Sequence, residues 1–86
     1  WIVEVNGHII QPWARLKVAN LKSATLEHAN LEHADLEHAN LQSATLEGAN
    51  LEHANLQCAK LEGANLRNTN LSEANLKMAN LEHAKL

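Results

Sequence analysis

The chain has 86 residues, enough for one small domain, and 45% of it is hydrophobic, nearly all Leu and Ala. Phe and Tyr are absent, so a core of this composition must be narrow and uniform, because few large rings are present to fill an irregular space. The formal net charge of −3 argues against general affinity for nucleic acid, which requires clustered Lys and Arg.

Residues 1–13 are predicted to form a hairpin-like cap. β-branched residues flank the dipeptide Asn6-Gly7, which favours a tight hairpin turn because both turn residues must adopt positive φ. Pro12 ends the run, since it cannot donate a hydrogen bond to a strand ladder. We expect Trp1 and Trp13 to cover the open end of the structure that follows. The alternative is that these two side chains form a docking surface.

Residues 14–86 follow a strict repeat of five. Leu occupies every fifth position from Leu16 to Leu86, and Ala stands two residues before each Leu, with Thr69 as the one exception. The residue directly before Leu is usually Asn, Asp or Thr, and two mostly polar residues come after it. A repeat this regular indicates a solenoid in which each unit stacks on its neighbours.

The period of five excludes a plain helix and a straight strand. Five residues of α-helix rotate through about 500°, so the leucines would spiral around the helix and form no stripe. In a straight strand, side chains alternate between faces, and successive leucines would point to opposite sides. A chain that bends once per five residues keeps every Leu on one side.

Four right-angle bends close a square coil of about 20 residues, whose coils stack at about 4.8 Å through backbone hydrogen bonds. The preference of parallel crossovers favours a right-handed coil. The expected fold is therefore an all-β, right-handed quadrilateral parallel β-helix over residues 14–86, preceded by the cap of residues 1–13. Spacing alone leaves a triangular coil open.

The tandem Ala29-Asn30-Leu31-Glu32-His33 and its repeats resemble the pentapeptide-repeat family over residues 14–86. This resemblance implies a four-sided right-handed β-helix with the central Leu and the preceding Ala pointing inward. The family is abundant in cyanobacteria, and most of its members have no assigned biochemical role. Its best understood members, the quinolone-resistance proteins, resemble duplex DNA in shape and charge and bind DNA gyrase.

Residues that are 20 apart should stack on one side of the coil. Asn20 then lies next to Asn40, where the amides can bond up the stack or to the bends. From Glu27 to Ala59 the chain carries six acids and no Lys or Arg, which predicts an acidic belt. The belt is either a docking surface for a basic partner or a solvated face that keeps the rod soluble. The candidate interaction surface comprises Glu27, Glu32, Asp35, Glu37, Glu47, Glu52, His33 and His53.

The histidines recur in the unit Glu-His-Ala, but consecutive ones lie on different sides and cannot share a metal. His33 and His53 should stack with Glu73, and His38 with Cys58 and Met78. Parallel side chains on a flat wall converge poorly for tetrahedral zinc, so we predict no metal site and no cofactor. Histidine protonation near pH 6 offers a pH-dependent association as a hypothesis.

No nucleophile, base and orienting group occur together, so we predict a non-enzymatic interaction module, with a gyrase-binding DNA mimic as the alternative. The single cysteine, Cys58, excludes an internal disulfide. No run is apolar enough to cross a membrane and no leader pattern is visible. Because the chain begins at Trp1, we expect a processed or partial sequence. A cytoplasmic location is a separate expectation. We expect a protein partner, a homo-oligomer through the open C-terminal end, and no direct contact with nucleic acid.

Overall fold

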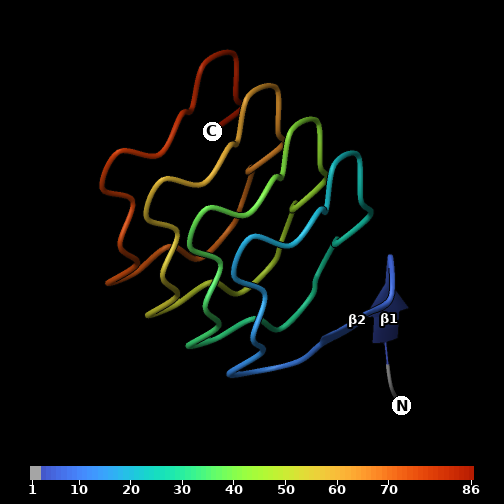
Figure 1. The fold of residues 1–86 in the computed structure, drawn as a ribbon. Helices are drawn as coiled ribbons and strands as arrows, with labels where there is room; N and C mark the ends of the chain where they lie inside the picture. The colour runs from blue at the N-terminus through green and yellow to red at the C-terminus, as the bar shows by residue number, and fades with distance from the viewer. Residues whose placement is uncertain (1–2) are drawn as a thin grey trace.

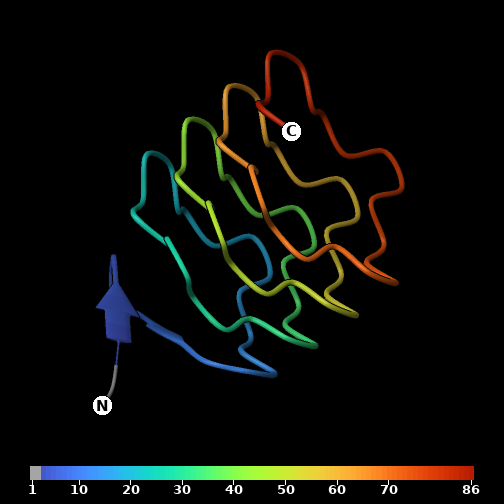
Figure 2. The ribbon, with the colours of Figure 1, turned by 180° about the vertical axis from the view of Figure 1, so that it is seen from behind.

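The computed structural model describes residues 3–86. The chain winds into stacked coils, each of which bends four times (Figure 1). Single residues pair in parallel with the residue 20 positions later, from Arg15 with Asp35 to Asn65 with Lys85. Twenty residues correspond to four pentads, which excludes the triangular coil. The fold is the expected right-handed quadrilateral β-helix, and the view from behind shows the same corners in register from coil to coil (Figure 2). The coils form bends and single-residue bridges, so the extended strands are confined to the hairpin.

The N-terminal hairpin consists of β1 (Val3–Val5) and β2 (His8–Ile10), which pair antiparallel. Its turn residues are Asn6 with φ 51° and Gly7 with φ 81°. Two consecutive positive φ values define the tight turn whose twist matches that of the strands. This turn confirms the hairpin predicted from the Asn-Gly dipeptide.

Each corner of the coil is a four-residue turn that starts at Leu. The Ala of the next pentad donates its N–H to the Leu carbonyl, as from Ala19 to Leu16 at 3.0 Å. The second residue after Leu has positive φ throughout, from Val18 at 54° to His83 at 61°, and Trp13, the second residue after Gln11, has a φ of 64°. This pattern is that of a type II turn, which usually places Gly or Asn there. Here the position also accepts His, Ser, Cys, Met and even the β-branched Val18, for which positive φ is unusual.

Gly48 and Gly63 occupy this same left-handed position, so they are favoured by the backbone rather than merely tolerated at an outer site. At Gly48 a second cause adds to the first. The ring of His28, one coil earlier, lies over the glycine, and a Cβ built there would be 2.5 Å from Nδ1 of His28.

Backbone hydrogen bonds connect each coil to the next. Leu16 donates its N–H to the carbonyl of Asp35 at 2.8 Å, and Asp35 donates in return to Ala14 at 2.9 Å. The left-handed residue adds a third bond, as from Val18 to Glu37 at 2.9 Å. With the bond inside the turn, four of the five backbone N–H groups of a complete pentad are satisfied.

The fifth N–H is satisfied by a side chain. Wherever Asn or Asp precedes Leu, its Oδ1 accepts the N–H of the residue after Leu, as Asn50 does from Glu52 at 3.0 Å. The same bond forms at Asp35 and at the other asparagines that precede Leu. The amides also bond up the stack, as from Asn75 Nδ2 to Asn55 Oδ1 at 3.4 Å. The preference for Asn and Asp therefore follows from hydrogen bonding.

This bond predicts the effect of changing Asn50. Asn50→Ala removes the acceptor for the Glu52 N–H and is expected to lower the free energy of unfolding by about 1 kcal/mol. In a chain of this size, that loss lowers the melting temperature by about 4–8 °C. Asn50→Asp keeps an oxygen in the same place, as Asp35 does, and should melt close to the wild type. Equal melting temperatures for the Ala and Asp variants would show that the bond does not stabilise the turn.

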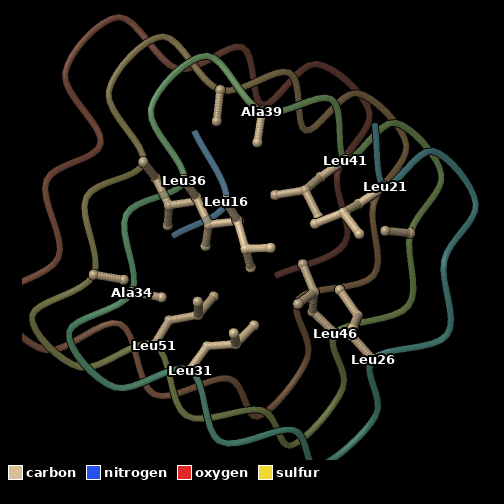
Figure 3. Packing of buried hydrophobic residues seen from close by; sticks show 14 of the residues in the cluster. Leu16, Leu21, Leu26, Leu31, Ala34, Leu36, Ala39, Leu41, Leu46 and Leu51 are labelled. Carbon is tan, nitrogen blue, oxygen red and sulfur yellow. The ribbon is translucent and has the colours of Figure 1, made fainter. Parts of the chain in front are cut away.

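The core is a column of leucines inside the square. Figure 3 shows Leu16 beside Leu36, Leu21 beside Leu41, Leu26 beside Leu46 and Leu31 beside Leu51, all pointing inward. Leu31, Leu41 and Leu51 are fully buried, and the preceding alanines line the same interior. Leucines and alanines of uniform size fill a tube whose cross-section repeats every coil, which agrees with the absence of Phe and Tyr.

The hairpin closes one end of this core. Ile10 is buried within the cluster and Val5 packs against it. The side-chain amide of Asn6 donates to the carbonyl of Asn20 at 3.2 Å, in the place where an earlier coil would bond. The prediction that Trp13 covers the opening is wrong: its side chain is 68% exposed, because the left-handed turn directs it outward. Trp1 lies outside the described residues.

The regular turn geometry begins at Gln11, inside the segment assigned to the cap. Ala14 donates to Gln11 at 3.1 Å across a turn that holds Pro12, and Trp13 donates to Glu32 at 2.9 Å. Proline at the second turn position suits its fixed φ.

At the C-terminal end of the coils, the leucines from Leu71 to Leu81 are only half-buried. Residues 3–86 contain no helix of the length and hydrophobicity needed to cross a membrane.

Candidate functional site

The four sides of the coil determine which outer residues become neighbours. We name each side by its first leucine: the Leu16, Leu21, Leu26 and Leu31 sides. On each side the residues before and after Leu point outward in columns, and the left-handed residues form columns at the corners. Backbone bonds such as that from His33 to Glu52, at 2.9 Å, hold these columns in register.

The predicted acidic residues are distributed over three consecutive sides. Glu27 and Glu47 stack on the Leu26 side, and Glu32 and Glu52 stack on the adjacent Leu31 side. Asp35 and Glu37 follow on the Leu16 side. The first four define what we call the acidic surface. Two adjacent sides thus carry four glutamates, with no Lys or Arg among residues 25–33 and 45–53.

Several carboxylates are engaged by neighbours. Lys17 Nζ lies 3.6 Å from Glu37 Oε1, and the Asp35 carboxylate accepts the N–H of Glu37 at 3.1 Å. Asn65 and Asn70 donate to Glu47 and Glu52, each at 3.3 Å. Among residues 3–86 no such bond reaches the carboxylate of Glu27 or Glu32, so within this range they are the least engaged carboxylates of the acidic surface.

An aromatic column runs beside the acidic surface. The Trp13 and His33 rings are stacked, with centroids 4.2 Å apart and planes inclined by 4°. His33 stacks in turn on His53 at 4.7 Å and 9°. His53 Nε2 also lies 3.6 Å from Glu52 Oε1. The stacking of His33 on His53 follows from their spacing of 20, and the same spacing from Trp13 to His33 is the signal that would have placed the tryptophan in this column.

Other chemistry-bearing side chains remain dispersed. His38, Cys58 and Met78 share one corner column, in which Cys58 carries a free, half-buried thiol. Within residues 3–86, no three side chains among His, Cys, Asp and Glu are arranged to hold a metal ion. The acidic residues face solvent in columns rather than converging on one point, so this geometry suits surface contact better than chemistry on a small molecule.

Two open grooves lie at the hairpin end. One, of about 340 Å³, lies between the hairpin and the turn around Glu27 and His28, and is bordered by Val3, Ile10 and Pro12. The second, of about 390 Å³, lies on the other side of the hairpin and is lined by Gly7, His8, Ile9, Gln11, Trp13, Ala14, Arg15 and Leu16. Trp13 thus belongs both to the aromatic column and to this second groove.

Comparison with solved structures finds pentapeptide-repeat proteins of cyanobacteria. Rfr23 from Cyanothece 51142 is 45% identical, with a TM-score of 0.67, over 84% of this chain and 52% of its own. The chain therefore spans about half the length of that protein. HetL from Nostoc sp. PCC 7120, described as involved in the regulation of heterocyst differentiation, is 37% identical over 84% of this chain and 38% of its own, with a TM-score of 0.47. The Nostoc protein alr5209 is 36% identical over 76% of this chain and 62% of its own, with a TM-score of 0.31.

No protein of curated function has a matching sequence. The family model for pentapeptide repeats matches in eight copies, over residues 19–57 and 53–86. These residues are the ones whose leucines fill the square core and whose asparagines complete the turns. The match extends over most of the chain, and the chain belongs to the pentapeptide-repeat family.

Proposed function

We propose that this chain is a non-enzymatic protein-interaction module whose acidic surface binds a basic partner. The observation that carries the proposal is the placement of Glu27, Glu47, Glu32 and Glu52 on two adjacent sides without an intervening Lys or Arg. A rigid backbone holds these carboxylates at fixed spacing, which reduces the entropy lost when a partner binds. Charge complementarity then provides orientation and fast association.

The proposal is tested with a fluorescent peptide of alternating Lys and Ser as a probe. Glu27→Gln combined with Glu32→Gln removes the two least engaged carboxylates and is expected to weaken binding about tenfold, more at low salt than near 150 mM, where screening is stronger. The matched control, Glu62→Gln with Glu82→Gln, makes the same change in net charge on the Leu21 side, opposite the Leu31 side. If both double variants weaken binding equally, the net charge of the chain explains the effect, and the proposal of a defined binding surface is refuted.

DNA mimicry is the second candidate. The six acids from Glu27 to Glu52 fall within two neighbouring coils, about 10 Å of the rod at the usual spacing between strands. Duplex DNA carries one charge per about 1.7 Å, so the same length of DNA has a similar number of charges. The charge density therefore favours mimicry. The acidic stretch is short, however, and this favours a smaller basic partner.

A gyrase supercoiling assay separates the two candidates. We expect no inhibition by the wild-type chain at concentrations that saturate the basic peptide. Inhibition that the Glu27→Gln and Glu32→Gln variant loses, and the control double variant keeps, would replace our proposal with mimicry.

A further inference from the structure

The aromatic column ends in a tryptophan with one open face. His33 covers one face of the Trp13 ring, and His53 supports His33 from the next coil. Trp13 is nevertheless 68% exposed, so its other face is open to solvent. The stack holds the ring in one orientation, and a partner that binds it loses little further freedom in the protein.

The open face borders a groove with a mixed lining. Ile9, which is 44% exposed, is paired with Glu4 on the outer face of the hairpin, while the neighbouring Ile10 is buried in the core. Ile9 and Trp13 line the groove of about 390 Å³ together with Arg15. Trp and Arg are the residues most enriched at the energetic centres of protein interfaces.

The charge at this groove is opposite to that of the acidic surface. Arg15 is exposed and forms no ion pair within residues 3–86, whereas Lys17 on the same side is next to Glu37. Between residues 5 and 26 the chain has three bases and no acid. The acids that the fold places beside this segment are Glu4, which pairs with Ile9, and Asp35, which follows Arg15 in the next coil and accepts the N–H of Glu37. A planar guanidinium with free donors matches a carboxylate in bidentate geometry.

We infer that Ile9, Trp13 and Arg15 form a second docking site, for a peptide segment that carries an aromatic side chain next to a carboxylate. The aromatic ring stacks on the open face of Trp13 against Ile9, which extends the column by one ring. The carboxylate pairs with Arg15. This inference extends the proposed interaction role, but it uses a surface that is separate from the four glutamates.

Two other occupants fit less well. Single-stranded nucleic acid also stacks on tryptophan, but Glu32, on the next coil of the same side, repels a polyanion. A second copy that stacked its own Trp13 on this one would bring two Arg15 side chains together, and like charges placed face to face disfavour association. A short partner segment with an aromatic side chain next to a carboxylate can stack on the Trp13 ring and pair with the Arg15 guanidinium at the same time.

The test is an NMR titration of the ¹⁵N-labelled chain with the capped peptide Gly-Asp-Phe-Asp-Gly. We expect the indole N–H of Trp13 and the side chain of Arg15 to shift, and replacement of Phe by Ala or of Asp by Lys in the peptide to weaken binding at least tenfold. Trp13→Ser should weaken binding similarly and still fold, because Ser23 and Ser43 occupy equivalent turn positions. Arg15→Gln should act in the same direction, while the matched control Lys77→Gln, on the same side near the other end, should have no effect.

Three results would overturn the inference: unchanged affinity of the Trp13→Ser and Arg15→Gln variants, shifts confined to other residues, or tighter binding of an oligo-dT strand than of the peptide. Glu27→Gln with Glu32→Gln removes the negative charge of Glu32 beside the aromatic column, so it should not weaken this titration. Failure of the acidic surface to bind a basic probe is therefore distinguishable from failure of this site.

Discussion

Replacement of Leu51 by arginine is expected to leave the chain unfolded at 25 °C. Leu51 is fully buried and stacks beside Leu31 in a part of the tube that is lined by Leu and Ala. No polar or charged side chain among residues 3–86 is buried in this core, so no acid receives a guanidinium there. A charge buried without a partner costs more than a small domain can offset. Each coil packs only on its neighbours, so a defect in the middle separates the two halves of the core.

Graded variants make this prediction quantitative. Leu51→Ala leaves a cavity and should lower the free energy of unfolding by about 2–5 kcal/mol in urea denaturation. Glu52→Ala, at the next residue, loses one 3.3 Å bond from Asn70 and should change stability by no more than about 0.5 kcal/mol. A Leu51→Arg variant with a cooperative transition near the wild-type midpoint would contradict the inward direction of the leucines.

Removal of the Ile10 side chain is expected to open the N-terminal end of the core. Ile10 contributes the buried side chain of the hairpin, and Ile-to-Ala changes at buried sites cost about 2–5 kcal/mol. We expect a value near 2 kcal/mol, because Ile10 lies at the end of the core. Hydrogen exchange should accelerate first at Leu16 and Leu21, whose amides bond to the next coil beneath the hairpin.

Ile9→Ala is the matched control for the hairpin. Ile9 precedes Ile10 directly but points outward, so its loss should change stability by less than about 0.5 kcal/mol. If both variants destabilise the chain equally, the hairpin contributes through its strand pairing rather than by covering the core. Uniform acceleration of exchange along all coils would likewise contradict a local role for Ile10.

The pattern of residues was sufficient to predict the repeat geometry but not the role of every position. The spacing of Leu16 and its successors required a bend every five residues. The Asn6-Gly7 turn could be predicted equally well, because few dipeptides accept two positive φ values. The left-handed backbone of the residue two after Leu was missed, although Gly48 and Gly63 both occupy it. Val18 and Ser43 at equivalent positions concealed the signal, since these residue types rarely adopt positive φ.

The candidate surfaces were predicted in part. Stacking of His33 on His53 follows from a spacing of 20, and the structure confirms it. Trp13 was assigned to the cap because an apolar ring near an open core usually covers it. Instead, the turn at Pro12 directs the ring outward, and Ile10 is buried in the core. The backbone conformation at the corner decides whether an apolar residue beside the first coil points inward. This conformation cannot be predicted from the type of that residue alone.

The sequence by itself determined the inward column of leucines, the parallel stacking of outer residues and the family, because one local bend repeats in every pentad. The spacing alone left a three-sided coil open and the family resemblance predicted four sides, which the tertiary structure confirmed. Only the tertiary structure decided which carboxylates are engaged by lysine or asparagine and which face of Trp13 is open. These features depend on contacts between residues about 20 positions apart, and the bend angle that brings them together is set by backbone hydrogen bonds between coils rather than by any one pentad.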